Sequence, residues 1–224
     1  MYIEINNYTK ILSKTTVLND ISIKMDKGKV YGFQGCNGSG KTMLMRAICG
    51  LISPTKGEVI IDNKPLSKKN SFPDSVGILI ENPGFLSYYS GFKNLKIIAQ
   101  IKNMITDETI RATMSKLGLD PYDNKKYGKY SLGMKQKLGI AAAIMEEPEI
   151  IILDEPFNAL DEKSVTIVGN EILNLRNKNK LIILACHDSK ELEYLCDEIF
   201  VIENGKIKDH RKFTHIGDYD NEEK

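Results

Sequence analysis

The sequence predicts an α/β fold with a mixed, largely parallel core sheet, an antiparallel β subdomain and a helical subdomain. Strands are expected at 150–153, 181–185 and 198–202, with helices between them. The first 62 residues are rich in strands, whereas from about 85 to 146 apolar residues recur at helical spacing. Strands that alternate with helices are typical of a parallel sheet with helices on its faces.

The individual elements follow from local patterns. The early strands are expected at 2–6, 20–25, 29–34 and 57–62, and a further buried strand at 76–80. Within the helical region, a first helix covers 92–101, and a second begins after Thr106 with Asp107 and Glu108 in its first turn. Residues 1–209 are predicted to form a single domain, with the helical subdomain at about 85–146 and a polar, loosely held tail at 210–224.

Composition excludes several classes of protein. The chain has 224 residues, 31 basic and 30 acidic, so nothing indicates a nucleic-acid partner. Its apolar runs are far shorter than the roughly 18 residues of a membrane-spanning helix, and residues 1–5 alternate like a strand rather than a signal peptide. Four cysteines, at 36, 49, 186 and 196, form no C-x-x-C pair, which argues for free thiols rather than a zinc or redox site.

A glycine-rich turn joins the expected strand 29–34 to a helix. It fits G-x-x-x-x-G-K-[ST] at every fixed position, with Gly35, Cys36, Asn37, Gly38, Ser39, Gly40, Lys41 and Thr42. Glycines permit backbone conformations whose N–H groups cradle phosphate oxygens. In this pattern the lysine contacts the β- and γ-phosphates and the threonine hydroxyl ligates Mg²⁺. The strand–turn–helix context disfavours an incidental match, and alkylation of Cys36 is expected to block nucleotide binding.

Two carboxylates follow the expected strand at 150–153. They are Asp154 and Glu155, and the four apolar residues before them are typical of a strand buried on both faces. Open α/β sheets bind ligands at the carboxyl ends of such strands. We expect Asp154 to hold Mg²⁺ through water and Glu155 to polarise the attacking water. On its own, the segment is equally well explained as a strand that ends in polar residues.

The segment 130–136, Tyr-Ser-Leu-Gly-Met-Lys-Gln, opens an expected helix at 132–146. A serine hydroxyl, a glycine N–H and a helix N-terminus can bind an anion, although Ser-x-Gly is also an ordinary cap. Ser131 lies 90 residues after Lys41 and 23 before Asp154, at the end of the helical region. In this place the segment, with Ser131 and Gly133, resembles the signature of ABC-type ATPases. The chain is identified as a member of that family to about residue 209, which implies a P-loop ATPase domain.

The resemblance implies roles for four further residues. Asp161 resembles the last residue of the D-loop, which crosses the dimer interface, and His187 falls at the switch histidine that contacts the γ-phosphate. Leu12 occupies the place of the aromatic residue that stacks on adenine, and Glu81 that of a glutamine that senses Mg²⁺. We therefore expect weaker selectivity for adenine and stronger dependence on Mg²⁺.

The run Ile-Glu-Asn-Pro at 80–83, together with Ser-Leu-Gly-Met-Lys-Gln, resembles the ATPase subunits of bacitracin- and lantibiotic-type exporters. This branch implies an ATPase that drives export through a separate permease, held by it at the cytoplasmic face of the membrane. The family implies a head-to-tail dimer, with each ATP between residues 35–42 of one subunit and 131–133 of the other. The transported substrate, the direction, and the choice between a homodimer and a heterodimer stay open.

The same residues also bear on other functions. A soluble ABC ATPase in a non-transport process is the principal alternative, although ribosome-acting members usually carry two nucleotide domains and DNA-repair members a long coiled coil. Glu155 and His187 disfavour a non-hydrolysing regulatory subunit. A metabolic kinase would leave the signature segment and Asp161 unexplained.

Overall fold

A six-stranded sheet forms the centre of the computed structural model, which describes residues 1–67, 72–81, 84–187 and 190–213. Its strand order is β10-β9-β3-β8-β7-β6. The strands are β3 (Lys29–Gln34), β6 (Val76–Leu79), β7 (Ile150–Asp154), β8 (Leu181–Cys186), β9 (Glu198–Glu203) and β10 (Lys206–Lys212). All neighbours are parallel except the β9–β10 hairpin at one edge. The expected mixed, largely parallel core sheet is confirmed.

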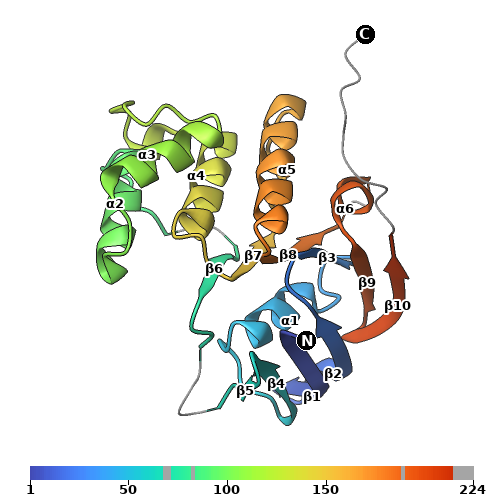
Figure 1. Cartoon of the computed structure of the whole chain (residues 1–224). Coiled ribbons are helices and arrows are strands. Elements are labelled where there is room, and N and C mark those ends of the chain that lie inside the picture. Colours follow the sequence, from blue (N-terminus) through green and yellow to red (C-terminus); the bar gives the residue numbers. More distant parts are fainter. Residues whose placement is uncertain (68–71, 82–83, 188–189, 214–224) are drawn as a thin grey trace.

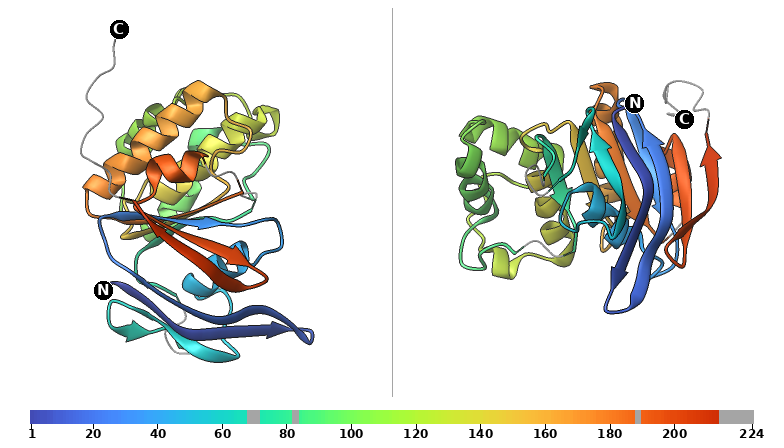
Figure 2. Two further views of the ribbon diagram at one scale, coloured as in Figure 1. Left: turned by 90° about the vertical axis from the view of Figure 1, so that its right-hand side faces the viewer. Right: turned by 90° about the horizontal axis from the view of Figure 1, so that it is seen from below.

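An antiparallel sheet lies below the core sheet in Figure 1, in the order β2-β1-β4-β5. Its strands are β1 (Ile3–Leu12), β2 (Thr15–Met25), β4 (Lys56–Ile61) and β5 (Lys64–Pro65). Helix α1 (Lys41–Ile48) lies between the two sheets, as the left view in Figure 2 shows. Leu44, Met45 and Ile48 of α1 belong to one apolar core with residues of both sheets. This core holds the start of α1 in place beside the glycine-rich turn.

The other face of the core sheet carries α4 (Leu132–Ile144), α5 (Glu162–Asn177) and α6 (Lys190–Leu195). The helical subdomain adds α2 (Gly91–Lys102), α3 (Asp107–Lys116) and a short 3-10 turn (Tyr127–Lys129). The helices begin where the sequence provides caps, since Ser90, Thr106 and Ser131 each accept a hydrogen bond from the backbone N–H three residues on. One apolar core joins these helices to the sheet. The predicted helical subdomain therefore has its own helices but shares the central core.

Two regions differ from expectation. β1 and β2 are much longer than 2–6 and 20–25, because register shifts after Ile5 break the period-two alternation by which strands are recognised. β10 was not predicted: it is a polar edge strand that pairs only with β9, and it extends to Lys212, past the expected boundary at 209. Residues 214–224 of the expected tail lie outside the described residues of the chain.

Candidate nucleotide-binding site

The glycine-rich turn between β3 and α1 has a backbone that requires glycine at several points. Gly38 and Gly40 have φ of 80° and 114°, conformations that side chains disfavour. At Gly35 a Cβ atom would lie 2.3 Å from the carbonyl oxygen of Ile202. α1 begins after Gly40 without a side-chain cap. Its first N–H groups can therefore serve an anion held in the turn.

The side chain of Lys41 folds over this turn. It is 6% exposed, and its Nζ donates to the carbonyl oxygens of Gly35 and Cys36 at 2.6 and 3.2 Å. Its charge is thus fixed beside the N–H groups of the turn. This is the place that the sequence predicted for the β- and γ-phosphates.

The β9–β10 hairpin supports the turn from outside. The N–H of Gly205 donates to the carbonyl oxygen of Ser39 at 2.8 Å, and the carbonyl oxygen of Gly205 accepts from the N–H of Asn19 at 2.8 Å. No pattern in the sequence indicated this contact. Asn204-Gly205 is a frequent two-residue hairpin turn and could have revealed the hairpin, although not what it touches.

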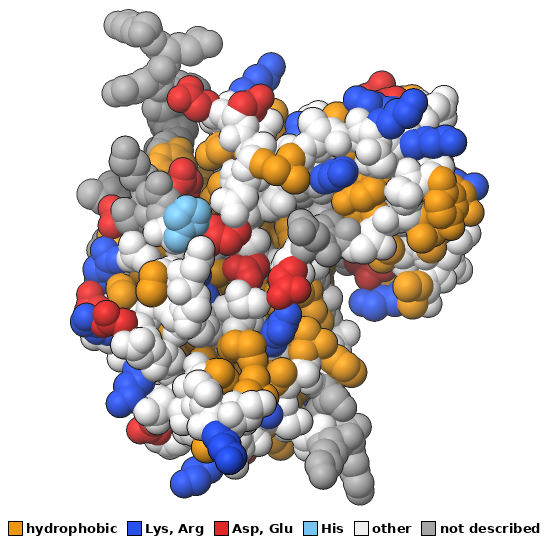
Figure 3. All heavy atoms as spheres, turned by 180° about the vertical axis from the view of Figure 1, so that it is seen from behind, with side chains coloured by type: hydrophobic (Ala, Val, Ile, Leu, Met, Phe, Trp, Pro, Cys, Tyr) orange, Lys and Arg blue, Asp and Glu red, His pale blue; other side chains and the backbone are white. Residues whose placement is uncertain are grey.

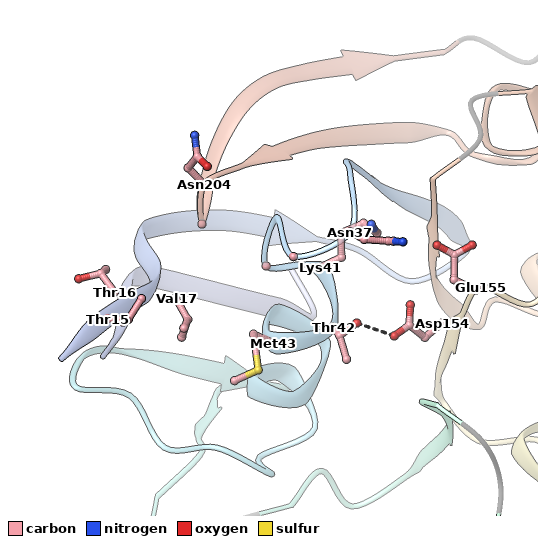
Figure 4. Close-up of a pocket in the computed structure, with 13 residues that line it drawn as sticks. Thr15, Thr16, Val17, Asn37, Lys41, Thr42, Met43, Asp154, Glu155 and Asn204 are labelled. Atoms are coloured by element: carbon pink, nitrogen blue, oxygen red, sulfur yellow. Dashed lines mark hydrogen bonds between the residues drawn. The ribbon is translucent and has the colours of Figure 1, made fainter. Parts of the chain in front are cut away.

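The structure brings Thr42 and Asp154, the two predicted Mg²⁺ ligands, into contact. Oγ1 of Thr42 donates to Oδ2 of Asp154 at 2.7 Å (Figure 4). Burial raises the pKa of Asp154, opposed by this hydrogen bond and by the charge of Lys41. Hydroxyl and carboxylate oxygens suit Mg²⁺, which usually takes its other ligands from phosphates and water. Within the described ranges, no group of three or more His, Cys, Asp or Glu could hold a metal ion.

Glu155 and His187 also come together. Oε2 of Glu155 lies 2.9 Å from Nδ1 of His187, and the two residues follow the adjacent parallel strands β7 and β8. The backbone of Glu155 has φ of 49°, and its carbonyl oxygen accepts a 2.9 Å hydrogen bond from Nε2 of Gln136 in α4. Seen from behind, acidic side chains gather near one histidine beside the notch next to the helical subdomain (Figure 3). The sequence predicted the two side chains but not the hydrogen bond from Gln136.

A cavity of about 400 Å³, a size typical of small-molecule sites, lies beside the turn. It is lined by Thr15, Thr16, Val17, Asn37, Gly38, Gly40, Lys41, Thr42, Met43, Asp154, Glu155, Asn204 and Gly205. Residues 15–17 come from the β1–β2 hairpin, across the cavity from the two carboxylates (Figure 4), and the sequence analysis did not single them out. None of these lining residues is aromatic.

The family model for the ABC transporter matches residues 18–158. Over 216 residues the chain is 44% identical to an uncharacterized ABC transporter ATP-binding protein, YybJ of Bacillus subtilis, covering 96% of this chain and 99% of that protein. The chain belongs to the ABC transporter family. Among the described residues of this ABC ATP-binding protein, no helix combines the length and apolar content needed to cross a bilayer.

Other relatives define the branch. The chain is 37% identical to the bacitracin transport ATP-binding protein BcrA of Enterococcus faecalis, over 96% of this chain and 73% of that one. It is 34% identical to the lantibiotic transport ATP-binding protein SrtF of Streptococcus pyogenes, over 92% and 88%. The branch assigned from the sequence is confirmed. These relatives support a transporter ATP-binding subunit and give no support to the non-transport alternative.

Solved structures confirm the fold. An ATP-binding subunit of an ABC transporter superimposes with a TM-score of 0.85 at 24% identity, over 95% of this chain and 90% of that one. The dimeric bacterial ABC transporter cassette MJ0796 gives 0.84 at 22% identity, over 94% and 98%. The predicted ABC-type domain architecture is therefore the observed one.

Two predicted ABC positions lie apart from the lining of the cavity. Leu12 is at the end of β1, opposite Thr15, with its side chain 39% exposed. The neighbouring residues 15–17, rather than Leu12, form that wall of the cavity. Glu81 follows β6 and is paired with Arg46 of α1. The expected roles of Leu12 and Glu81 stay predictions.

The ABC signature and D-loop residues also lie outside this lining, and they have local partners instead. Oγ of Ser131 accepts from the N–H of Met134 at 3.2 Å, and Oδ1 of Asp161 accepts from the N–H of Ser164 at 2.8 Å. These hydrogen bonds cap α4 and α5. At Gly133 a Cβ atom would lie 2.9 Å from the carbonyl oxygen of Ala159, so the predicted signature segment packs closely against the chain two residues before Asp161.

Proposed function

We propose that this chain hydrolyses ATP with Mg²⁺ and thereby drives a separate membrane permease that exports a peptide antibiotic. The main observation behind this proposal is a pair of contacts beside the phosphate turn, at one edge of the core sheet. Thr42 contacts Asp154, and Glu155 contacts His187. The relatives named for bacitracin and lantibiotic transport support the class of cargo.

The residues divide the work of hydrolysis between them. Lys41 and the N–H groups of the turn bind and orient the phosphates, while bound Mg²⁺ neutralises some of their charge. Oε2 of Glu155 orients the attacking water and accepts its proton. Nδ1 of His187 holds that carboxylate, and Gln136 fixes the backbone beneath it. Phosphoryl transfer depends mainly on such positioning and charge.

A second ATPase subunit would complete the site. In a single copy neither Ser131 nor Gly133 lines the cavity. A head-to-tail pair would bring the N-terminus of α4 from one subunit over the phosphates bound by the other. The dimeric MJ0796 cassette, which shares the fold, supports the formation of a dimer. The partner is a second copy or a homologous ATPase, held by the permease at the inner face of the membrane.

Hydrolysis is tested with purified protein by phosphate release and by binding of a fluorescent ATP analogue. We expect Glu155→Gln to lose at least about 100-fold in kcat, as for a removed general base, while it still binds ATP and accumulates as a dimer on a sizing column. Lys41→Ala should lose nucleotide affinity itself. Wild-type turnover by Glu155→Gln would remove the assigned role of Glu155, and unchanged affinity of Lys41→Ala would count against the phosphate turn.

Transport is tested in cells. The chain is expected to co-purify with a membrane permease, and its expression with that permease should raise the bacitracin or lantibiotic concentration needed to stop growth. Glu155→Gln, expressed to the same level, should give no protection. Protection that is equal for both forms would separate resistance from hydrolysis and contradict the proposal.

A further inference from the structure

Glu81 and Arg46 form an ion pair at the edge of the site that the mechanism above does not use. Nη2 of Arg46 lies 2.6 Å from Oε1 of Glu81. Arg46 is four residues after Thr42 on α1, so the two side chains leave the same face of the helix. Glu81 follows β6, which pairs in parallel with β7, the strand that ends at Asp154. The pair therefore lies next to the expected metal ligands.

Both side chains lie at the edge of the proposed Mg-ATP site. Arg46 is on the face of α1 that carries Thr42, and Glu81 follows β6, the strand next to β7. An unpaired acid beside the phosphates would repel their oxygens, because like charges disfavour each other across several ångströms.

We propose that Arg46 is the positioning residue of Glu81. It holds the Glu81 carboxylate against α1 and offsets its charge, so that an acid can lie beside Mg-ATP without weakening phosphate binding. The inference rests on the proposed function, in which the cavity binds Mg-ATP.

The exposure of the pair indicates where its effect should be measured. The side chains of Arg46 and Glu81 are 34% and 65% exposed, and exposed ion pairs add little to folding stability. Arg46→Met, which keeps most of the apolar stem, should therefore leave the melting temperature of the nucleotide-free protein nearly unchanged. Its effect should fall on nucleotide binding instead.

The test is a double-mutant cycle on the Kd of a fluorescent ATP analogue with Mg²⁺. Arg46→Met alone should raise this Kd about tenfold, the order of effect that one unpaired charge has on a nearby ligand charge in surroundings of intermediate polarity. Introduced into Glu81→Gln protein, the same change should alter the Kd less than about twofold, because no acid is left to offset. Arg46→Lys should restore most of the affinity.

Lys64→Met provides a matched control. Lys64 pairs with Asp74 at 2.9 Å, is at least as exposed as Arg46, and does not line the nucleotide cavity. Its substitution should not change the Kd. If Arg46→Met weakens nucleotide binding equally with Glu or Gln at position 81, Arg46 attracts the phosphates directly. If Arg46→Met does not change the Kd, the ion pair does not affect nucleotide binding. Either result overturns the inference. Wild-type protein that fails to bind the analogue would instead overturn the proposed function.

Discussion

Replacing Gly205 by alanine tests whether the β9–β10 hairpin holds the phosphate turn in shape. Gly205 has φ of 73°. A Cβ atom there would lie 2.5 Å from the carbonyl oxygen of Val17 and 3.0 Å from its carbonyl carbon. Both are backbone atoms, so no side-chain rotation can relieve the clash. Gly205 also makes the hydrogen bonds that join the hairpin to Ser39 and Asn19.

The magnitude follows from these contacts. A non-glycine residue at this φ costs about 1 kcal/mol. Moving the hairpin off Val17 stretches two backbone hydrogen bonds, each of which contributes about 1 kcal/mol. We therefore expect Gly205→Ala to lose about 3 kcal/mol of unfolding free energy, which for a chain of this size lowers the melting temperature by roughly 6–12 °C. Since Ser39 belongs to the turn, ATP affinity should fall in the same variant.

Gly118→Ala separates the clash from the backbone cost. Gly118 also has a positive φ, of 67°, but its nearest neighbours are side-chain ends, Cδ1 of Ile167 at 3.5 Å and Nζ of Lys137 at 3.7 Å. It should lose only the conformational cost of about 1 kcal/mol. Urea and thermal unfolding of the nucleotide-free variants measure both losses. If Gly205→Ala loses no more than Gly118→Ala, the reasoning about the hairpin is refuted.

Three further predictions follow. N-ethylmaleimide should abolish ATP binding by modifying the exposed Cys36, because the other three cysteines are buried. Cys36→Ser should bind ATP and resist the reagent. Labelled protein with undiminished affinity for ATP would contradict this. Asp154→Asn should raise the melting temperature at pH 7, where burial and a raised pKa make the ionised carboxylate costly, and should end Mg²⁺-dependent hydrolysis; a lower melting temperature would count against the argument. Burial opposes ionisation of Glu198, but hydrogen bonds from Lys29 and His210 outweigh it and lower its pKa. That stabilisation is present above the ordinary pKa of 4.5 and is lost as the pH falls through the lowered pKa of the folded state. Glu198→Gln should therefore be less stable than the wild type at pH 7, and its stability should fall less in acid. Urea unfolding at several pH values measures both effects.

The site residues that the sequence predicted share one property: each lies in a continuous segment or directly follows a buried strand. The phosphate turn is a continuous segment, so its pattern is complete in the sequence. Asp154 ends one buried apolar strand and Glu155 follows it directly, while His187 follows another, and the ends of adjacent parallel strands meet at one edge. Knowledge of the strands was therefore enough to bring these side chains together.

The contacts that were missed join elements distant in the chain. Gln136 reaches Glu155 from another element, and Gly205 reaches Ser39 across 166 residues. Residues 15–17 reach the cavity only because β1 and β2 extend beyond their regular apolar alternation. Hydrophobic period and turn signals describe each element but not how two elements pack, so no pattern in the sequence could have placed these groups.

Helix α4 connects the two halves of the proposed site within one chain. Its N-terminus is capped by Ser131, the signature serine, and Gln136 donates from the second turn to the backbone of Glu155. Five residues of helix span only about 7.5 Å, and a capped, packed helix moves as a unit. In the proposed head-to-tail pair, an anion bound at the start of α4 would act, through Gln136, on the backbone of Glu155, the proposed general base of the same subunit. Each proposed catalytic carboxylate would then respond to the nucleotide held by the other subunit, so the two sites would be coupled without a contact between their carboxylates.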